Sequence, residues 1–135
     1  MYMLDTDTCS YILKRKPSSV LARLEALRDT PVCVSEITRA ELLYGAARTP
    51  ERSRAIGELI AELLSRLLVL DWNGAERYAA IRADLEASGS VVGNMDMLIG
   101  AHALHVDAVL VTNNTRHFER IPELRLENWV EAGNP

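Results

Sequence analysis

The sequence predicts an α/β fold built on a mostly parallel sheet. Short apolar runs alternate along the chain with longer segments of helical periodicity, which is the pattern of consecutive strand–helix units. No internal repeat or low-complexity segment interrupts this alternation. The length of 135 residues suits one domain, since a domain typically has about 150 residues. We therefore expect a single domain over residues 1–135, with right-handed crossovers between parallel strands.

Four strands are expected from the apolar runs. The first opens the chain directly before Asp5, the second follows Pro31 and the third precedes Asp71. The last is the clearest, because it contains the β-branched residues Val109 and Val111. The predicted strands are 2–4, 32–34, 67–70 and 108–112.

Five helices are expected between and around these strands. Ser35 is a favourable N-cap for one of them, and Gly45 weakens its last turn. Asn94 is a candidate cap for the last helix. The helix after Pro50 carries a wide aliphatic stripe between residues 56 and 67, which suits either the core or a partner helix. The predicted helices are 18–27, 35–47, 50–65, 73–87 and 94–104.

Composition and charge exclude several classes of protein. The formal net charge is −4 and 25% of residues are charged, which argues against nucleic-acid binding through overall basicity but leaves local basic strips open. All of the 15 basic residues except Lys14 and Lys16 are arginines, which suit bidentate contacts with phosphate. Cys9 and Cys33 have no metal-ligand spacing, so we expect free thiols. With no signal peptide and no apolar span of 18 residues, we expect a cytoplasmic protein without membrane contact.

Polar side chains follow two of the predicted strands. Asp5 and Asp7 come after the first strand, and Asn113 and Asn114 follow the last. Ligands of open α/β sheets gather beyond the carboxyl ends of the strands. Turns and helix caps use the same residue types, so each of these residues has that alternative explanation.

Asp96 is the only acidic residue in an apolar helix. Such a helix is normally buried, and a carboxylate beside buried surface is costly unless it is paired or binds a metal. A favourable interaction with the helix dipole is the simpler explanation. The small residues Gly100 and Ala103, one and two turns further on, are expected to leave room beside the carboxylate.

A third carboxylate is available from the helix that begins after Ser35. Glu41 lies at the margin of its apolar face, and Glu36 in the first turn is a rival that spacing does not exclude. Oxygen ligands from separate segments suit Mg²⁺ or Mn²⁺, which can activate water for hydrolysis. The histidines His102, His105 and His117 lack zinc-site spacing, so structural or surface roles are expected for them.

The segment 3–8 also has the apolar-DxDxT form of haloacid-dehalogenase-like phosphatases, with Asp5 as nucleophile and Asp7 as acid/base. That family needs a downstream lysine and a further acidic pair. No lysine follows Lys16, and few residues remain after Thr112, so this alternative is disfavoured.

Four segments in order resemble the PIN-domain toxins of the VapC type: Met-Leu-Asp-Thr-Asp at 3–7, Ser-Glu-Ile-Thr-Arg-Ala-Glu-Leu-Leu-Tyr-Gly at 35–45, Gly-Asn-Met-Asp-Met-Leu-Ile-Gly-Ala-His at 93–102 and Leu-Val-Thr-Asn-Asn-Thr-Arg-His-Phe at 110–118. The ending at 121–129 is also similar. The resemblance covers nearly the whole chain. It implies a PIN-like three-layer fold with a central, mostly parallel sheet of four to five strands flanked by helices.

The resemblance also implies a function. Members of this family are toxins of type II toxin–antitoxin systems that cleave RNA with Mg²⁺, often tRNA and notably initiator tRNA near the anticodon. It implies a VapB-type antitoxin, DNA contact through that antitoxin, and a homodimer. A catalytically inactive PIN-like binding module is the alternative from another class.

The family's site residues match positions of this chain. The acids match Asp5, Glu41 and Asp96, with Asp5 and Asp96 as metal ligands and Glu41 at a second metal or acting through a water. This match favours Glu41 over Glu36. The strand-end position matches Asn114. Supporting residues are Thr6, Asp7 and Thr112, and the candidates for RNA contact are Lys14, Arg15, Arg116 and Arg120.

Overall fold

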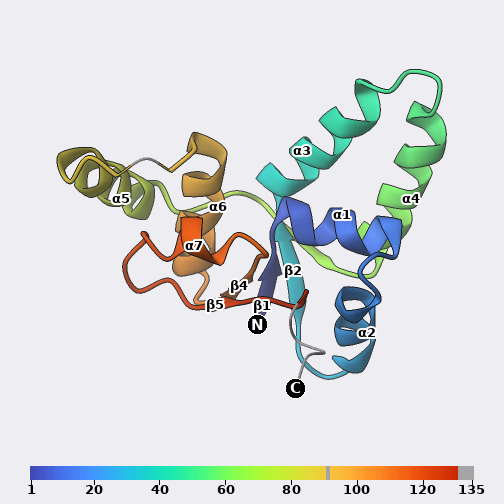
Figure 1. Ribbon diagram of the computed structural model, residues 1–135, viewed down its shortest axis with the longest axis horizontal. Coiled ribbons are helices and arrows are strands. Elements are labelled where there is room, and N and C mark those ends of the chain that lie inside the picture. The colour runs from blue at the N-terminus through green and yellow to red at the C-terminus, as the bar shows by residue number, and fades with distance from the viewer. Residues whose placement is uncertain (91, 131–135) are drawn as a thin grey trace.

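The computed structural model describes residues 1–90 and 92–130, and it contains the predicted parallel sheet (Figure 1). The strands lie in the order β3–β2–β1–β4–β5, and all four ladders between neighbours are parallel. Leu4 pairs with Val111, so Asp5 and Thr112 leave the sheet side by side. The strands are β1 (Tyr2–Leu4), β2 (Val32–Ser35), β3 (Leu68–Leu70), β4 (Val109–Val111) and β5 (Leu126–Glu127).

Seven helices within the described residues cover the two faces of the sheet. Because side chains alternate along a strand, Met3 joins an apolar cluster with α5, α6 and α7, whereas Leu4 joins one with α1, α2 and α4 on the other face (Figure 1). None of the described helices is long and apolar enough to cross a bilayer. The helices are α1 (Thr6–Lys14), α2 (Ser18–Ala26), α3 (Glu36–Ala47), α4 (Ser53–Ser65), α5 (Ala75–Ala87), α6 (Asn94–His105) and α7 (Thr115–Phe118).

Helix α1 is absent from the sequence prediction. Its first turns are rich in Thr, Asp and Ser, which have modest helix propensity, so the periodicity is weak there. The helix is stabilised instead by the Asp5 cap and by burial of Cys9 and Ile12. The short elements α7 and β5 were also not predicted.

Two predicted helix starts differ in detail. Ser35 is the N-cap of α3, and its hydroxyl accepts the Ile37 N–H as expected. Asn94, however, is the first residue of α6, and Gly93 occupies the cap position without a side-chain bond. The structure also divides the α4 stripe, since Ile60 and Leu63 are buried whereas Leu59 is 49% exposed.

The two cysteines are free and buried, as expected. Burial raises the pKa of Cys33 to about 11 and raises that of Cys9 further. Both thiols therefore stay protonated at neutral pH and act as small apolar core residues.

The end of the described chain packs back against β1. Trp129 is 1% exposed, and its ring meets Tyr2 edge to face at 5.7 Å between centroids. Its indole N–H donates to Glu127 Oε1 at 2.8 Å, and Glu127 also pairs with Arg23 of α2 at 3.1 Å. Trp129 thus ties the C-terminal segment to the first strand and to α2.

Replacing Trp129 by alanine is expected to lower the free energy of unfolding by about 3–5 kcal/mol, the usual cost of deleting a buried aromatic ring. Trp129→Phe keeps most of the volume and loses only the bond to Glu127, so a cost of about 1–2 kcal/mol is expected. Equilibrium unfolding in urea measures both values. Equal midpoints for wild type and Trp129→Ala would contradict the packing role.

Candidate active site

Asp5 is held at the carboxyl end of β1, where the central strands end together. It is 4% exposed, and its backbone N–H donates to the Val111 carbonyl at 3.0 Å. Its Oδ1 accepts the Thr8 N–H at 2.8 Å, which makes Asp5 the N-cap of α1. The capping explanation is therefore correct, and it leaves the second carboxylate oxygen without a role in the cap.

The Asp5 carboxyl group is electrostatically unusual. Burial raises its pKa from 3.8 to about 6, although hydrogen bonds from Thr112 and Thr8 favour the charged form. The nearby charge of Asp7 raises the pKa further. A buried carboxylate that lacks enough compensation is a group that would gain from a bound cation.

Glu41 reaches the same end of the sheet from α3. Its Oε1 accepts a hydrogen bond from the Thr6 hydroxyl at 2.5 Å, across 35 residues of sequence. Its rival Glu36 instead pairs with Arg39 at 2.6 Å, where both side chains are exposed. The structure therefore places Glu41 beside the residues that follow β1, and Glu36 in a surface ion pair.

Asp96 lies in the first turn of α6 and faces the same group of acids. Burial raises its pKa, His117 lowers it, and the charges of Glu41 and Asp7 raise it again. Asp96 on α6 therefore lies within electrostatic range of Glu41 on α3 and Asp7 on α1. Its Oδ2 lies 3.1 Å from His117 Nε2.

The sequence predicted open space beside Asp96 at Gly100 and Ala103, and this prediction is wrong at Gly100. A Cβ atom on Gly100 would meet Ile121 Cδ1 at 2.7 Å, so the apolar segment after α7 fills that position. Gly100 and the buried Ala103 serve close packing of α6 rather than access to the carboxylate.

The turn after β4 positions α7 next to Asp96. The Asn114 N–H donates to Thr112 Oγ1 at 2.9 Å, and the Asn114 carbonyl accepts the N–H groups of His117 and Phe118. The Asn114 side chain is exposed at the start of α7 and makes no capping bond. This turn sets the position from which the His117 ring meets Asp96.

His117 is the site residue that sequence reasoning missed. The available signal was its place three residues after Asn114, one helical turn beyond the strand-end motif.

His102 and His105 behave as expected: His105 is exposed, whereas His102 is 1% exposed with its Nδ1 2.8 Å from Ser35 Oγ. Burial and the neighbouring His105 lower the pKa of His102, so it stays neutral and joins α6 to the start of α3.

The donor set fits a hard cation. In the described residues, no three His, Cys, Asp or Glu side chains are close enough together to form a closed metal site. Mg²⁺ usually needs only one or two carboxylates, because it keeps several waters. Oxygen donors from Asp5 and Asp96, whose pKa values are both raised by burial and by neighbouring acids, match that requirement.

The predicted basic residues are exposed but do not all share one place. Lys14 lines a groove that also contains Asp7 and Glu41. Arg15 ends α1 and lines a smaller pocket between α1, α2 and α4. Arg116 and Arg120 are exposed in and after α7, on the Asp96 side of the site.

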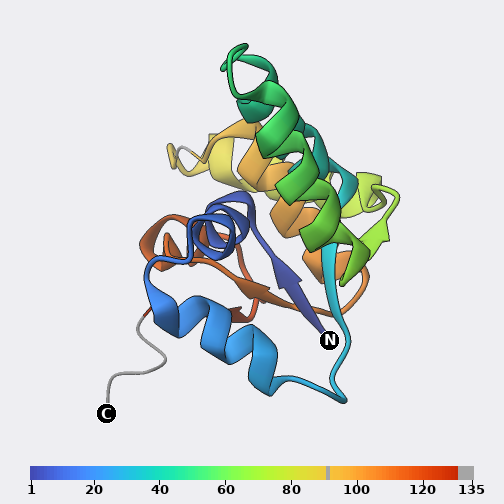
Figure 2. The same cartoon turned by 90° about the vertical axis from the view of Figure 1, so that its right-hand side faces the viewer.

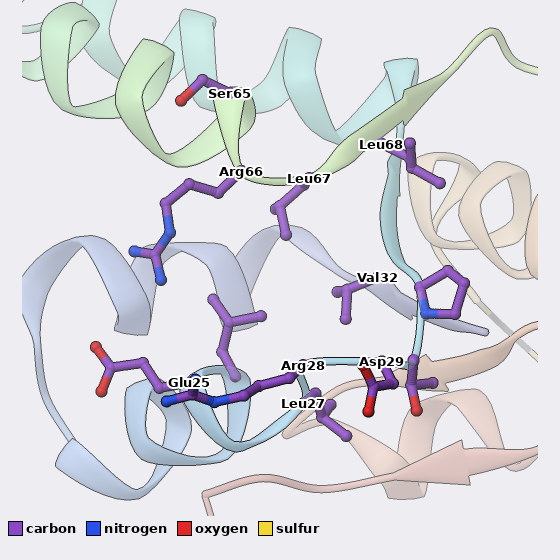
Figure 3. Close-up of a pocket in the computed structure, with 12 residues that line it drawn as sticks. Glu25, Leu27, Arg28, Asp29, Val32, Ser65, Arg66, Leu67 and Leu68 are labelled. Carbon is purple, nitrogen blue, oxygen red and sulfur yellow. The ribbon is translucent and has the colours of Figure 1, made fainter.

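A larger cavity of about 800 Å³ lies away from the acids (Figure 3). It is formed where β2 and β3 begin, between the ends of α2 and α4, and it contains Val32 and Leu68 (Figure 3). Arg66 extends into it from the end of α4 (Figure 3). Because it lies at the amino ends of the strands, its size does not make it the candidate active site.

The sequence comparisons agree with the fold. A family model described as the PIN domain matches residues 2–124. The chain is 44% identical over 133 residues to Ribonuclease VapC2 of Haemophilus influenzae, covering 96% of this chain and 98% of that protein. It is 43% identical over 132 residues to the tRNA(fMet)-specific endonuclease VapC of Salmonella typhimurium, covering 95% and 97%.

Solved structures give the same result. VapBC2 of Rickettsia felis, bound to a DNA fragment from its promoter, contains a chain that matches with a TM-score of 0.90 and 38% identity, covering 95% of this chain and 98% of that one. DNA-bound VapBC of Salmonella typhimurium matches with a TM-score of 0.84 and 42% identity, covering 95% and 97%.

Proposed function

The chain belongs to the PIN-domain family, among the VapC ribonucleases, and we propose that it is the toxin of a type II toxin–antitoxin pair and acts as a Mg²⁺-dependent endoribonuclease. The observation that carries this proposal is that Glu41 contacts Thr6, the residue after Asp5, and that the charge of Glu41 acts on Asp96. Burial raises the pKa of both Asp5 and Asp96, and Glu41 raises that of Asp96. Such a group favours cation binding next to a phosphodiester.

We assign Asp5 and Asp96 as the metal ligands, with Mn²⁺ as an alternative to Mg²⁺. Glu41 binds a second ion or orients the attacking water. When bound, the ion supplies an activated water and offsets charge on the phosphate in the transition state.

The chain's own groups hold these acids in place. Thr112 and Thr8 donate hydrogen bonds to Asp5, and the Thr6 hydroxyl holds Glu41. His117 orients the Asp96 carboxylate through the 3.1 Å contact. Asn114 is exposed at the start of α7, and we assign its amide to position a water or a phosphate oxygen.

The proposed substrate is tRNA, with the anticodon region of initiator tRNA as the first target to test. The Salmonella relative named as tRNA(fMet)-specific supports this choice. Splayed bases of a loop are read mainly by shape and stacking, so an acidic protein needs only local cations such as Lys14, Arg15, Arg116 and Arg120. We also propose a cytoplasmic location, because tRNA is the proposed substrate.

The proposed protein partner is a VapB-type antitoxin, through which any DNA contact would occur. The similar solved complexes contain both components and DNA. A small pocket of about 60 Å³ between α1, α2 and α4 has Leu13, Leu21 and the half-exposed Leu59 in its lining beside charged side chains, and we propose that the antitoxin contacts this side of the toxin. We also propose that the toxin forms a homodimer.

The decisive experiment incubates the purified protein with total tRNA, with and without Mg²⁺, and sequences the new RNA ends. Discrete cuts that depend on Mg²⁺ are expected. RNA binding without cuts would instead indicate an inactive PIN-like module. Phosphate release from small esters with intact RNA would indicate a phosphatase.

A further inference from the structure

A groove of about 490 Å³ runs from the acidic site along the space between α1 and the α3–α4 pair. Figures 1 and 2 show α3 and α4 side by side, rising away from the sheet above α1. Thr6, Asp7 and Glu41 line one part of the groove, at the acids. A polymeric substrate that lies in this groove would therefore pass next to Glu41.

Elsewhere the groove is lined by aliphatic side chains and by three cations. Lys14 comes from the end of α1, Arg48 from the end of α3 and Arg52 from the start of α4. Within residues 1–90 and 92–130, none of these three side chains has a carboxylate at ion-pair distance. Their charge is available to a ligand, next to the negative charge of the acids.

An exposed aromatic ring lies next to one of these cations. Tyr44 is 66% exposed, which is unusual for a large aromatic side chain. It lies one helical turn after Glu41, and the Arg48 guanidinium lies over its ring at 5.5 Å from the centroid. One face of α3 thus presents an acid, an aromatic ring and a cation in succession.

We propose that this face of α3 and the adjoining groove bind an unpaired RNA segment, with one base stacked on Tyr44 and phosphates next to the cut held by Arg48, Arg52 and Lys14. The proposal rests on the proposed ribonuclease function. Aromatic rings beside cations are the usual way to hold a single strand, because every base has a face that stacks and every nucleotide has a charge.

Charge favours RNA over a protein partner here. The three cations line the same groove as Glu41 and Asp7, so a chain that carries one negative charge per nucleotide can contact the cations while it reaches the acids. Aliphatic side chains, among them Leu42, Ile56 and Ile60, also line this groove, so an apolar partner helix is the other candidate occupant.

Tyr44→Ala tests the stacking contact. The KM for cleavage of a short single-stranded RNA spanning the cut is expected to rise about ten-fold with kcat nearly unchanged, as for loss of one base–aromatic stack. Tyr44→Phe should behave like wild type because the ring remains. Leu43→Ala is the matched control, since Leu43 is the 40% exposed neighbour on another face of α3.

An abasic scan of the RNA identifies the stacked nucleotide. Removing that one base should raise the KM of wild type about ten-fold but should not raise the KM of Tyr44→Ala further, because the contact is already lost. Arg48→Ala should reduce the salt dependence of binding by close to one charge, whereas Leu43→Ala should leave it unchanged.

Three results would overturn the proposal: an unchanged KM for Tyr44→Ala, equal effects of Tyr44→Ala and Leu43→Ala, or an abasic penalty that adds fully to that of Tyr44→Ala. Loss of self-association or of antitoxin binding with unchanged RNA cleavage would assign Tyr44 to a protein interface instead. A wild-type protein that does not cut tRNA or the oligonucleotide would contradict the proposed function itself, which is a separate outcome.

Discussion

Asp5→Asn is expected to abolish RNA cleavage and, in the same protein, to raise the stability of the metal-free fold. Loss of one metal ligand should reduce the single-turnover rate by at least about a thousand-fold, equivalent to about 4 kcal/mol. Asparagine can still accept the Thr8 N–H, so the cap on α1 is kept. Cleavage assays and thermal unfolding in the presence of EDTA measure the two effects.

The sign of the stability change follows from the pKa of Asp5. It is about 6 in the folded protein and near 3.8 when unfolded, so the stabilising contribution is complete below pH 3.8 and is lost as pH rises through 6. At pH 8 the charged, buried carboxylate costs the metal-free fold about 3 kcal/mol. The asparagine side chain of the variant cannot ionise, so this cost disappears.

Added Mg²⁺ provides the internal check. It should stabilise wild type, because it binds only the folded protein, and should have little effect on Asp5→Asn. Asp84→Asn, at an exposed position of α5, serves as the control and should change neither stability nor cleavage. A metal-free Asp5→Asn protein less stable than wild type at pH 8 would show that the carboxylate is compensated within the fold.

Asp96→Ala is expected to abolish both cleavage of tRNA and inhibition of growth while the protein stays folded. The carboxylate lies in the first turn of α6, where its loss costs only a few tenths to about 1 kcal/mol of helix-dipole stabilisation. Its proposed metal contact has no replacement. Cleavage by purified protein and growth after induction measure the two results, and circular dichroism verifies the fold.

His117→Ala separates the role of the carboxylate from that of its partner. Asp96 would remain, so a loss of about 10- to 100-fold in apparent Mg²⁺ affinity is expected rather than complete inactivity. Unchanged cleavage by a pure, folded Asp96→Ala protein would exclude Asp96 from the site. Equal inactivity of both variants would mean that the His117 contact is as essential as the carboxylate.

Some parts of the fold were predictable because they depend on local patterns. The central strands, the long helices and the Ser35 cap follow from periodicity and capping chemistry. Helix α1 was missed because its early residues favour no helix strongly, and it is stabilised by Asp5 and by burial. The prediction of open space at Gly100 was wrong because Ile121, which follows α7 in the chain, packs against that position.

The same division applies to the candidate site. Asp5 and Asp96 were found as carboxylates at a strand end and in a buried helix, and the resemblance chose Glu41 over Glu36. No local pattern indicated His117, because its contact with Asp96 joins two helices separated by β4. Acidic residues next to apolar segments can be recognised in the sequence. Their contact partners, such as His117 and Thr6, can be identified only from the tertiary structure.

By itself, the sequence determined the α/β class and the family, and it suggested the acids of the candidate site, since these depend on residue type and order. Only the tertiary structure decided which groups face one another. It placed Asp96 near His117, Glu41 on Thr6, and Arg48 over Tyr44 beside an open groove. The reason is that charge, burial and pKa depend on distances between segments remote in sequence, and the parallel sheet sets those distances by ending its central strands together.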